Sequence, residues 1–211
     1  NVSGLILPTS LKYTPYYWFE KQNNLETITV SKDSAYFYAE GNCLINKSTK
    51  ALVLGCKNSV IPEGVESIGN YSFYNCKDIA SVVIPEGVIS IGSCAFEGCT
   101  SLQTIHIPSS VKQIASSAFY GCTNLSSVVM SEGMEYIGAT AFAQCTQLKS
   151  VVIPSTVTYI APEAFKNCNS LTSITFNGTL EQWEDCVQGQ SWNYNVPATY
   201  VQCSDGQVSV K

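Results

Sequence analysis

Five cysteines recur at a constant interval of 23 residues: Cys76, Cys99, Cys122, Cys145 and Cys168. The residues around them keep the same step, as two consecutive stretches show: IPEGVISIGSCAFEGCTSLQTIH from Ile84 and IPSSVKQIASSAFYGCTNLSSVV from Ile107. A fixed period of this length is typical of repeat proteins, in which each unit buries its apolar face only against stacked neighbours. The chain is therefore predicted to be a stack of similar coils.

Each coil contains a short alternating segment that predicts a β-strand. In one coil Ile105 and Ile107 point inward, whereas Thr104 and His106 point outward. Stacking these segments gives a parallel sheet on one face of the molecule. The Ala-Phe-x-x-Cys segment of each coil fits a helical or 3₁₀ turn on the opposite face, and a short extended stretch lies between the two.

The repeat extends beyond the five regular coils toward the N-terminus. Leu7 and Val30 open two degenerate coils, so we expect about seven coils in a single domain spanning residues 1–211. Its parts are degenerate coils at 1–60, regular repeats at 61–175 and a C-terminal cap at 176–211. Residues 43–54 are apolar on both sides of a polar turn, which predicts a β-hairpin insert. Within the cap we expect a short helix from Leu180 with Thr179 as N-cap, then a strand over 199–203 and a tight turn at Asp205-Gly206.

The shared pattern LxxIxIPxxVxxIGxxAFxxCxx closely resembles the BspA-type leucine-rich repeats of bacterial surface proteins, over residues 4 to about 180. The resemblance implies a right-handed solenoid of the α/β class, export from the cell, and a role in adhesion or partner binding. It does not imply any catalytic activity.

Composition limits the kinds of partner. The net charge of −5 disfavours nucleic acid and anionic membranes, which both attract basic patches. No apolar run approaches the roughly 20 residues that span a bilayer, so membrane insertion is not expected. The chain begins without methionine or an apolar leader, and we interpret it as a mature or trimmed fragment of an extracellular or cell-surface protein.

The ten cysteines fall into different groups. The five at the 23-residue interval, here called the cysteine ladder, are predicted to be buried free thiols, because zinc sites need ligands a few residues apart. Parallel Cβ directions also disfavour disulfides between neighbouring coils. Cys43 could pair with Cys56 across the hairpin and Cys186 with Cys203 in the cap, and both pairings are left open.

Neither catalysis nor a cofactor is expected. The only histidine, His106, sits at an outward strand position without an Asp or Glu on its own strand. Glu63 and Glu86 should lie near each other along one edge, which is more typical of a solvated acidic stripe than of a calcium site. No glycine loop suited to phosphate binding is present.

The outward positions of the predicted sheet are the best candidate for function. We define the outer strip as these eight residues: Thr104, His106, Ser127, Val129, Ser150, Val152, Ser173 and Thr175. β-Propensity alone explains Thr and Val there, but a repeat array also presents an extended binding surface. We therefore expect a monomeric, non-catalytic module that binds a host or bacterial surface or extracellular-matrix protein. The alternatives are a rigid spacer, or a carbohydrate-binding module using the terminal aromatics such as Trp18 and Trp192.

Overall fold

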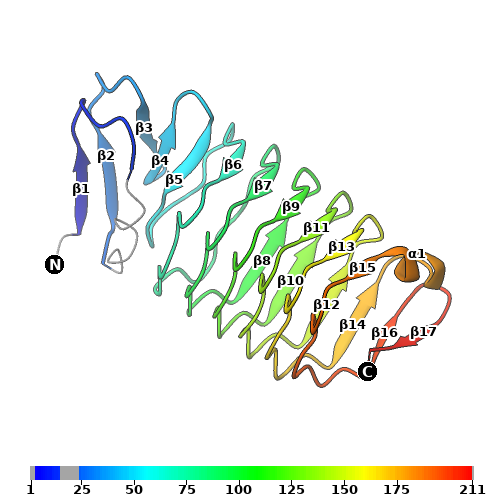
Figure 1. Cartoon of the computed structure of the whole chain (residues 1–211). Coiled ribbons are helices and arrows are strands. Elements are labelled where there is room, and N and C mark those ends of the chain that lie inside the picture. The colour runs from blue at the N-terminus through cyan, green and yellow to red at the C-terminus, as the bar shows by residue number, and fades with distance from the viewer. Residues whose placement is uncertain (1–2, 15–23, 211) are drawn as a thin grey trace.

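The computed structural model describes residues 3–14 and 24–210, which form a solenoid of stacked coils running from one end of the molecule to the other (Figure 1). The solenoid has about eight turns, one more than the repeat pattern predicted. The additional turn lies within the predicted C-terminal cap. There β15 and β16 continue both main sheets in parallel, although their sequence has lost the repeat signature.

One sheet contains the strands predicted from the alternating segments. Its order is β17-β16-β14-β12-β10-β8, and all neighbours are parallel except β16 and β17. Its strands are β8 (Thr104–Ile107), β10 (Ser127–Met130), β12 (Ser150–Ile153), β14 (Ser173–Phe176), β16 (Tyr200–Gln202) and β17 (Gln207–Ser209). We call it the six-stranded sheet. In each parallel strand inward and outward side chains alternate, as predicted.

A second, nine-stranded sheet lies beside the first, so the prediction of a parallel sheet on one face only was incomplete. The short extended stretch in each coil pairs with the same stretch in its neighbours, because stacking places these stretches in register. The strands are β3 (Phe37–Glu40), β4 (Cys43–Asn46), β5 (Ala51–Leu54), β6 (Ser67–Ile68), β7 (Ser90–Ile91), β9 (Gln113–Ile114), β11 (Tyr136–Ile137), β13 (Tyr159–Ile160) and β15 (Val187–Gln188).

The predicted hairpin is confirmed, and it connects the N-terminal coils to the regular stack. Strand β4 pairs antiparallel with both β3 and β5, whereas β5 pairs in parallel with β6. The hairpin therefore supplies a rung of the nine-stranded sheet. Before it, β1 (Gly4–Leu7) and β2 (Thr27–Val30) form a separate parallel pair (Figure 1).

The turns that follow the nine-stranded sheet are not helical, contrary to the prediction. In one coil Cys94 and Gly98 have positive φ values of 56° and 71°, and the same two positions repeat this geometry in the other regular coils. Left-handed residues four apart break a helix. The segment instead forms successive hydrogen-bonded turns, whose remaining N–H groups donate to the next coil.

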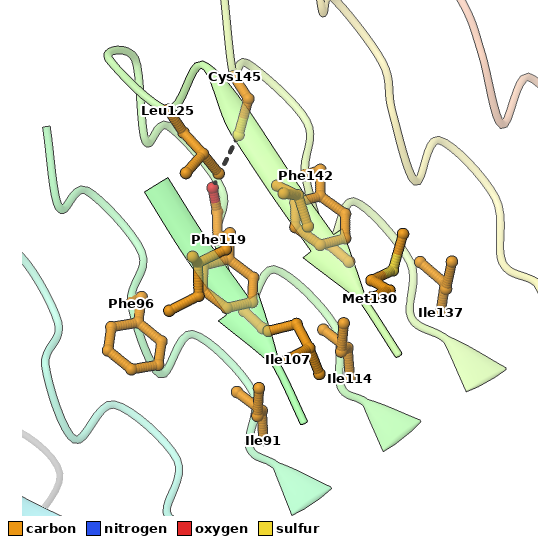
Figure 2. Close-up of a cluster of buried hydrophobic side chains, with 14 of the residues drawn as sticks. Ile91, Phe96, Ile107, Ile114, Phe119, Leu125, Met130, Ile137, Phe142 and Cys145 are labelled. Atoms are coloured by element: carbon orange, nitrogen blue, oxygen red, sulfur yellow. Dashed lines mark hydrogen bonds between the residues drawn. The ribbon is translucent and has the colours of Figure 1, made fainter. Parts of the chain in front are cut away.

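A continuous apolar core runs through the stack from Cys43 to Cys203. Five phenylalanines one coil apart stack along it with centroid separations of 4.9–5.3 Å: Phe73, Phe96, Phe119, Phe142 and Phe165. Figure 2 shows three of these rings beside the inward Ile and Met side chains of the two sheets. A smaller core packs β1 and β2 against the hairpin.

The C-terminal end of the core is closed by two indoles. Trp192 packs edge-on against Phe165, and Trp183 packs against Trp192. Trp183 belongs to the helix α1 (Leu180–Asp185). There the Thr179 side chain accepts from the Gln182 backbone N–H, and the Gln182 side-chain oxygen accepts from the Thr179 backbone N–H, which is a capping box. The predicted helix, its N-cap and the strand that follows are all confirmed.

Candidate binding face

The register of the six-stranded sheet places the residues of the outer strip in two columns. Ser127 lies directly beside Thr104 and Ser150, and Ser150 beside Ser173. In the second column Val129 lies between His106 and Val152, and Val152 is followed by Thr175. The prediction that these eight positions share one face is therefore matched by the strand pairing.

The outer strip is accessible and almost uncharged. The side chains of Val129 and Val152 are 54% and 40% exposed, and Val83 at the N-terminal end of the same column is 81% exposed. The first column offers hydroxyl groups, and His106 is the strip's only ionisable residue. The surface can therefore make broad apolar and hydrogen-bonding contacts, but it has no strong electrostatic attraction for a partner.

The structure extends this face by one strand that sequence reasoning assigned only to the cap. Strand β16 pairs in parallel with β14, with Gln202 beside Thr175, and its outward Tyr200 is 46% exposed. The sequence signal for this strand was the alternation of Tyr200, buried Val201 and Gln202. It was obscured because α1 and its connections lengthen this coil beyond the regular period.

His106 has one hydrogen-bond partner in the described part of the chain, the hydroxyl of Ser131 at 3.1 Å from Nε2. The sequence alone gave no indication of this contact. A Ser–His pair at this distance resembles a nucleophile and its base. In a catalytic site, however, a third group such as a carboxylate must also orient the base. Among the described residues no carboxylate bonds the other ring nitrogen.

Glu132, the carboxylate next to Ser131, accepts hydrogen bonds from residues of the following coils. Its oxygens accept from the Ser155 backbone and hydroxyl and from the Asn177 amide at 3.0–3.2 Å, linking three successive coils. Partial burial would raise the pKa of Glu132, but the hydrogen bonds from Asn177, Ser155 and Thr156 outweigh it and lower the pKa. This carboxylate is an ionised structural acceptor at the edge of the sheet.

The cysteine ladder is fully inside the core. Each of the last four thiols donates to the carbonyl of the phenylalanine 26 residues earlier, at 3.1–3.2 Å: Cys99 to Phe73, Cys122 to Phe96, Cys145 to Phe119 and Cys168 to Phe142. Figure 2 shows one of these bonds, from Cys145. Burial raises the pKa of Cys122 and Cys168 to about 12, so both are neutral at physiological pH. Neutral, buried thiols are neither nucleophiles nor metal ligands.

Neither of the two cysteine pairs is bridged in this structure. Cys43, Cys56, Cys186 and Cys203 are buried free thiols. Cys43 Sγ lies 3.5 Å from Gly41 O, whereas Cys56 Sγ lies 3.8 Å from Asn42 O. Cys43 and Cys56 therefore each have a backbone acceptor of their own. No group of three His, Cys, Asp or Glu residues in the described ranges could hold a metal ion.

The two tryptophans at the C-terminal end do not form a sugar-binding platform. Trp183 and Trp192 are only 4% and 8% exposed, so their rings are core residues and cannot stack on a ligand. The N-terminal aromatics Tyr16, Tyr17, Trp18 and Phe19 lie outside the described residues. In the described ranges no helix is long and apolar enough to cross a membrane.

Comparison with known proteins identifies the family. The model of the BspA type leucine rich repeat region matches residues 1–65 and 66–191, with six copies. The chain belongs to this family. No curated protein matches it.

Solved structures agree with this assignment. A leucine-rich repeat protein from Eubacterium ventriosum is 25% identical with a TM-score of 0.72, and the match covers 95% of this chain and 57% of that one. A leucine rich cell surface protein from Faecalibacterium prausnitzii is 29% identical with a TM-score of 0.63, covering 88% and 50%. The pneumococcal vaccine antigen PcpA shares the fold at 20% identity, with a TM-score of 0.76 and coverage of 99% and 57%. The chain thus spans about half the length of these relatives.

Proposed function

We propose that this chain is a non-catalytic binding module, displayed outside a bacterial cell, that contacts a host or bacterial surface protein through the outer strip. The single observation that supports this most is the strip itself, an exposed and nearly uncharged pair of columns on a rigid sheet. A relative described as a cell surface protein supports the location.

The geometry favours many weak contacts over a few strong ones. Strands of a sheet lie about 4.8 Å apart, so the five parallel strands β8 to β16 span roughly 20 Å. A lasting protein interface needs about 1,000 Å² of buried surface in total. A partner must therefore cover the whole width of the six-stranded sheet, and Val83 and Tyr200 at its ends extend the contact.

A binding test can separate this face from the rest of the surface. Ser127→Glu with Ser150→Glu places two charges side by side on the outer strip without touching the core. The matched control is Ser67→Glu with Ser90→Glu, two serines paired in the same way on the nine-stranded sheet.

Capture of extracellular-matrix or bacterial surface proteins on the immobilised chain is the measurement. The proposal predicts that the outer-strip variant loses at least about tenfold in affinity, since buried unpaired charges at an interface cost several kcal/mol. The control variant should bind like the parent. Equal binding by the parent and the outer-strip variant, or loss only in the control, would overturn the proposal.

A rigid spacer remains the second candidate, because one continuous core joins the hairpin to the cap. The spacer role predicts that deleting the chain from its full-length protein changes the reach of a flanking binding domain but not that domain's affinity. The outer-strip variant would then behave like the parent in every assay.

A further inference from the structure

The turns of neighbouring coils are joined by a repeated set of three hydrogen bonds, all with the same direction. At each junction three alternate backbone N–H groups donate to three carbonyls of the following coil. One such set has distances of 2.9, 2.8 and 2.9 Å and joins Ser117 to Ala139, Phe119 to Ala141 and Gly121 to Ala143. The column of turns therefore has a polarity, with carbonyls toward the N-terminus and N–H groups toward the C-terminus.

The last junction shows where this column ends. Glu163, Phe165 and Asn167 donate to the carbonyls of Gln190, Trp192 and Tyr194. By position, the donors of this final rung are the N–H groups of Ser191, Asn193 and Asn195, and none of the three donates to any described residue. We call these three N–H groups the open donor edge.

The open donor edge keeps the geometry of the internal junctions. Ser191 and Asn195 have φ values of 54° and 58°, close to those of Glu163 and Asn167 in the preceding coil. Two side chains hold the rung in place: Asn193 Nδ2 donates to Val210 O at 3.0 Å, and Asn195 Nδ2 to Asn167 Oδ1 at 2.8 Å. The donors are therefore fixed in position before anything binds, which reduces the entropy lost on association.

The cap covers other parts of the same end of the molecule, and in the described part of the chain it touches this edge only through Val210 O, which accepts from the Asn193 side chain. Strand β17 covers the last parallel strand of the six-stranded sheet (Figure 1). The Gln188 side chain donates to the carbonyls of Trp183 and Cys186. Along the final rung, Ser191, Tyr194 and Asn195 are exposed. Tyr194, at 55% exposure, adds an apolar contact beside the donors.

We infer that the open donor edge is a docking edge for a main-chain segment of a partner protein that takes the same turn conformation as the coils, which adds a further rung to the column of turns. Three donors on alternate residues match the carbonyls of a polypeptide, and in the internal junctions they reach three different residues rather than one anion. The edge also continues the coil–coil interface found at every other junction. Recognition of this kind resembles strand addition, because main-chain hydrogen bonds supply most of the affinity.

A second copy of the chain does not fit this role. Head-to-tail stacking would need free carbonyls at the other end of the column, but there Ser72 O already accepts from Gly55 N at 2.8 Å. We therefore assign the edge to a segment of a partner protein rather than to a head-to-tail copy. This inference concerns a different surface from the outer strip and does not depend on the function proposed above.

The test is amide hydrogen exchange, measured by NMR on the full chain with and without a synthetic peptide copying residues 107–129, which carries the carbonyls of one regular coil. At saturating peptide the amides of Ser191, Asn193 and Asn195 should exchange about tenfold more slowly, the size of one net hydrogen bond. The amides of Trp192 and Tyr194 already bond within the rung and should not change.

A matched pair of variants makes the result specific. Ser191→Asp places a negative charge where peptide carbonyls must approach, whereas Ser191→Asn is neutral, and both residues tolerate a positive φ. The protection should vanish in the Asp variant and persist in the Asn variant. Unchanged exchange in the parent, equal protection in both variants, protection at β1 or β17 instead, or protection that grows with the concentration of the chain alone would each overturn the inference.

Discussion

At the scale of single residues, Ser72 departs from the pattern of the core. The equivalent position is alanine in the following four coils: Ala95, Ala118, Ala141 and Ala164. The Ser72 hydroxyl is fully buried and has no hydrogen-bond partner among the described residues. A buried unsatisfied hydroxyl costs about 1–3 kcal/mol. It lies near the junction with the hairpin, where Gly55 packs against the Phe73 ring.

Ser72→Ala should therefore raise the free energy of unfolding by about 1 kcal/mol, because it removes the unpaired hydroxyl without leaving a large cavity. Urea unfolding followed by circular dichroism measures the change. The converse substitution Ala118→Ser introduces the same hydroxyl into a regular coil and should destabilise by a similar amount. A Ser72→Ala variant less stable than the parent would contradict the interpretation.

At the scale of the turn element, backbone conformation rather than side-chain contact selects the residue before each ladder cysteine. Four of the five coils have Asn or Gly there, namely Asn75, Gly98, Gly121 and Asn167. Gln144 occupies the fifth with φ at 64°, a conformation that glycine adopts more readily than glutamine.

Gln144→Gly should stabilise the protein by about 1 kcal/mol, because it relieves the left-handed strain at this turn. The control is Gln147→Gly, three residues further on at a position without a positive φ, which should destabilise by up to about 1 kcal/mol. Thermal or urea unfolding of both variants checks the prediction. Destabilisation of equal size in both would show that the turn geometry is not as described.

The elements also show how far the sequence alone could lead. The 23-residue step predicted the stacked coils and their core. The alternation around Ile105 predicted the strands of the six-stranded sheet and the positions of the outer strip, and the apolar residues around a polar turn at 43–54 predicted the hairpin. The pairing of the second sheet was not predicted and the turns were predicted wrongly, because two-residue strands and left-handed turns depend on hydrogen bonds between coils, which no single coil encodes. The last rung was missed because α1 interrupts the period before Tyr200.

At the scale of the whole molecule, the buried thiols should make stability depend steeply on alkaline pH. An unfolded thiol ionises with a pKa near 9, whereas burial raises the pKa of Cys122 to about 12. The native state thus favours the neutral thiol. The stabilisation of the folded state by this neutral thiol is fully present below pH 9 and is lost as the pH rises from 9 toward 12.

Between pH 8 and pH 10 the free energy of unfolding should therefore fall by about 1 kcal/mol for each ladder thiol. Urea unfolding at a series of pH values measures the slope. Cys122→Ala removes one such group, so its stability should fall less over the same interval, by about the contribution of one thiol. Parallel pH dependences for the parent and the variant would contradict the burial of this thiol.

The interior is one uninterrupted packed stack with neutral, unreactive sulfur along it, and for this reason we propose that function resides on the surface. Alkylation of the native protein at neutral pH, with the labelled positions read by mass spectrometry, tests this most directly. The account predicts that Cys76, Cys99, Cys122, Cys145 and Cys168 stay unlabelled until urea unfolds the chain and are then all modified. Rapid labelling of these five in the native state, or their recovery as disulfides or zinc ligands, would contradict it.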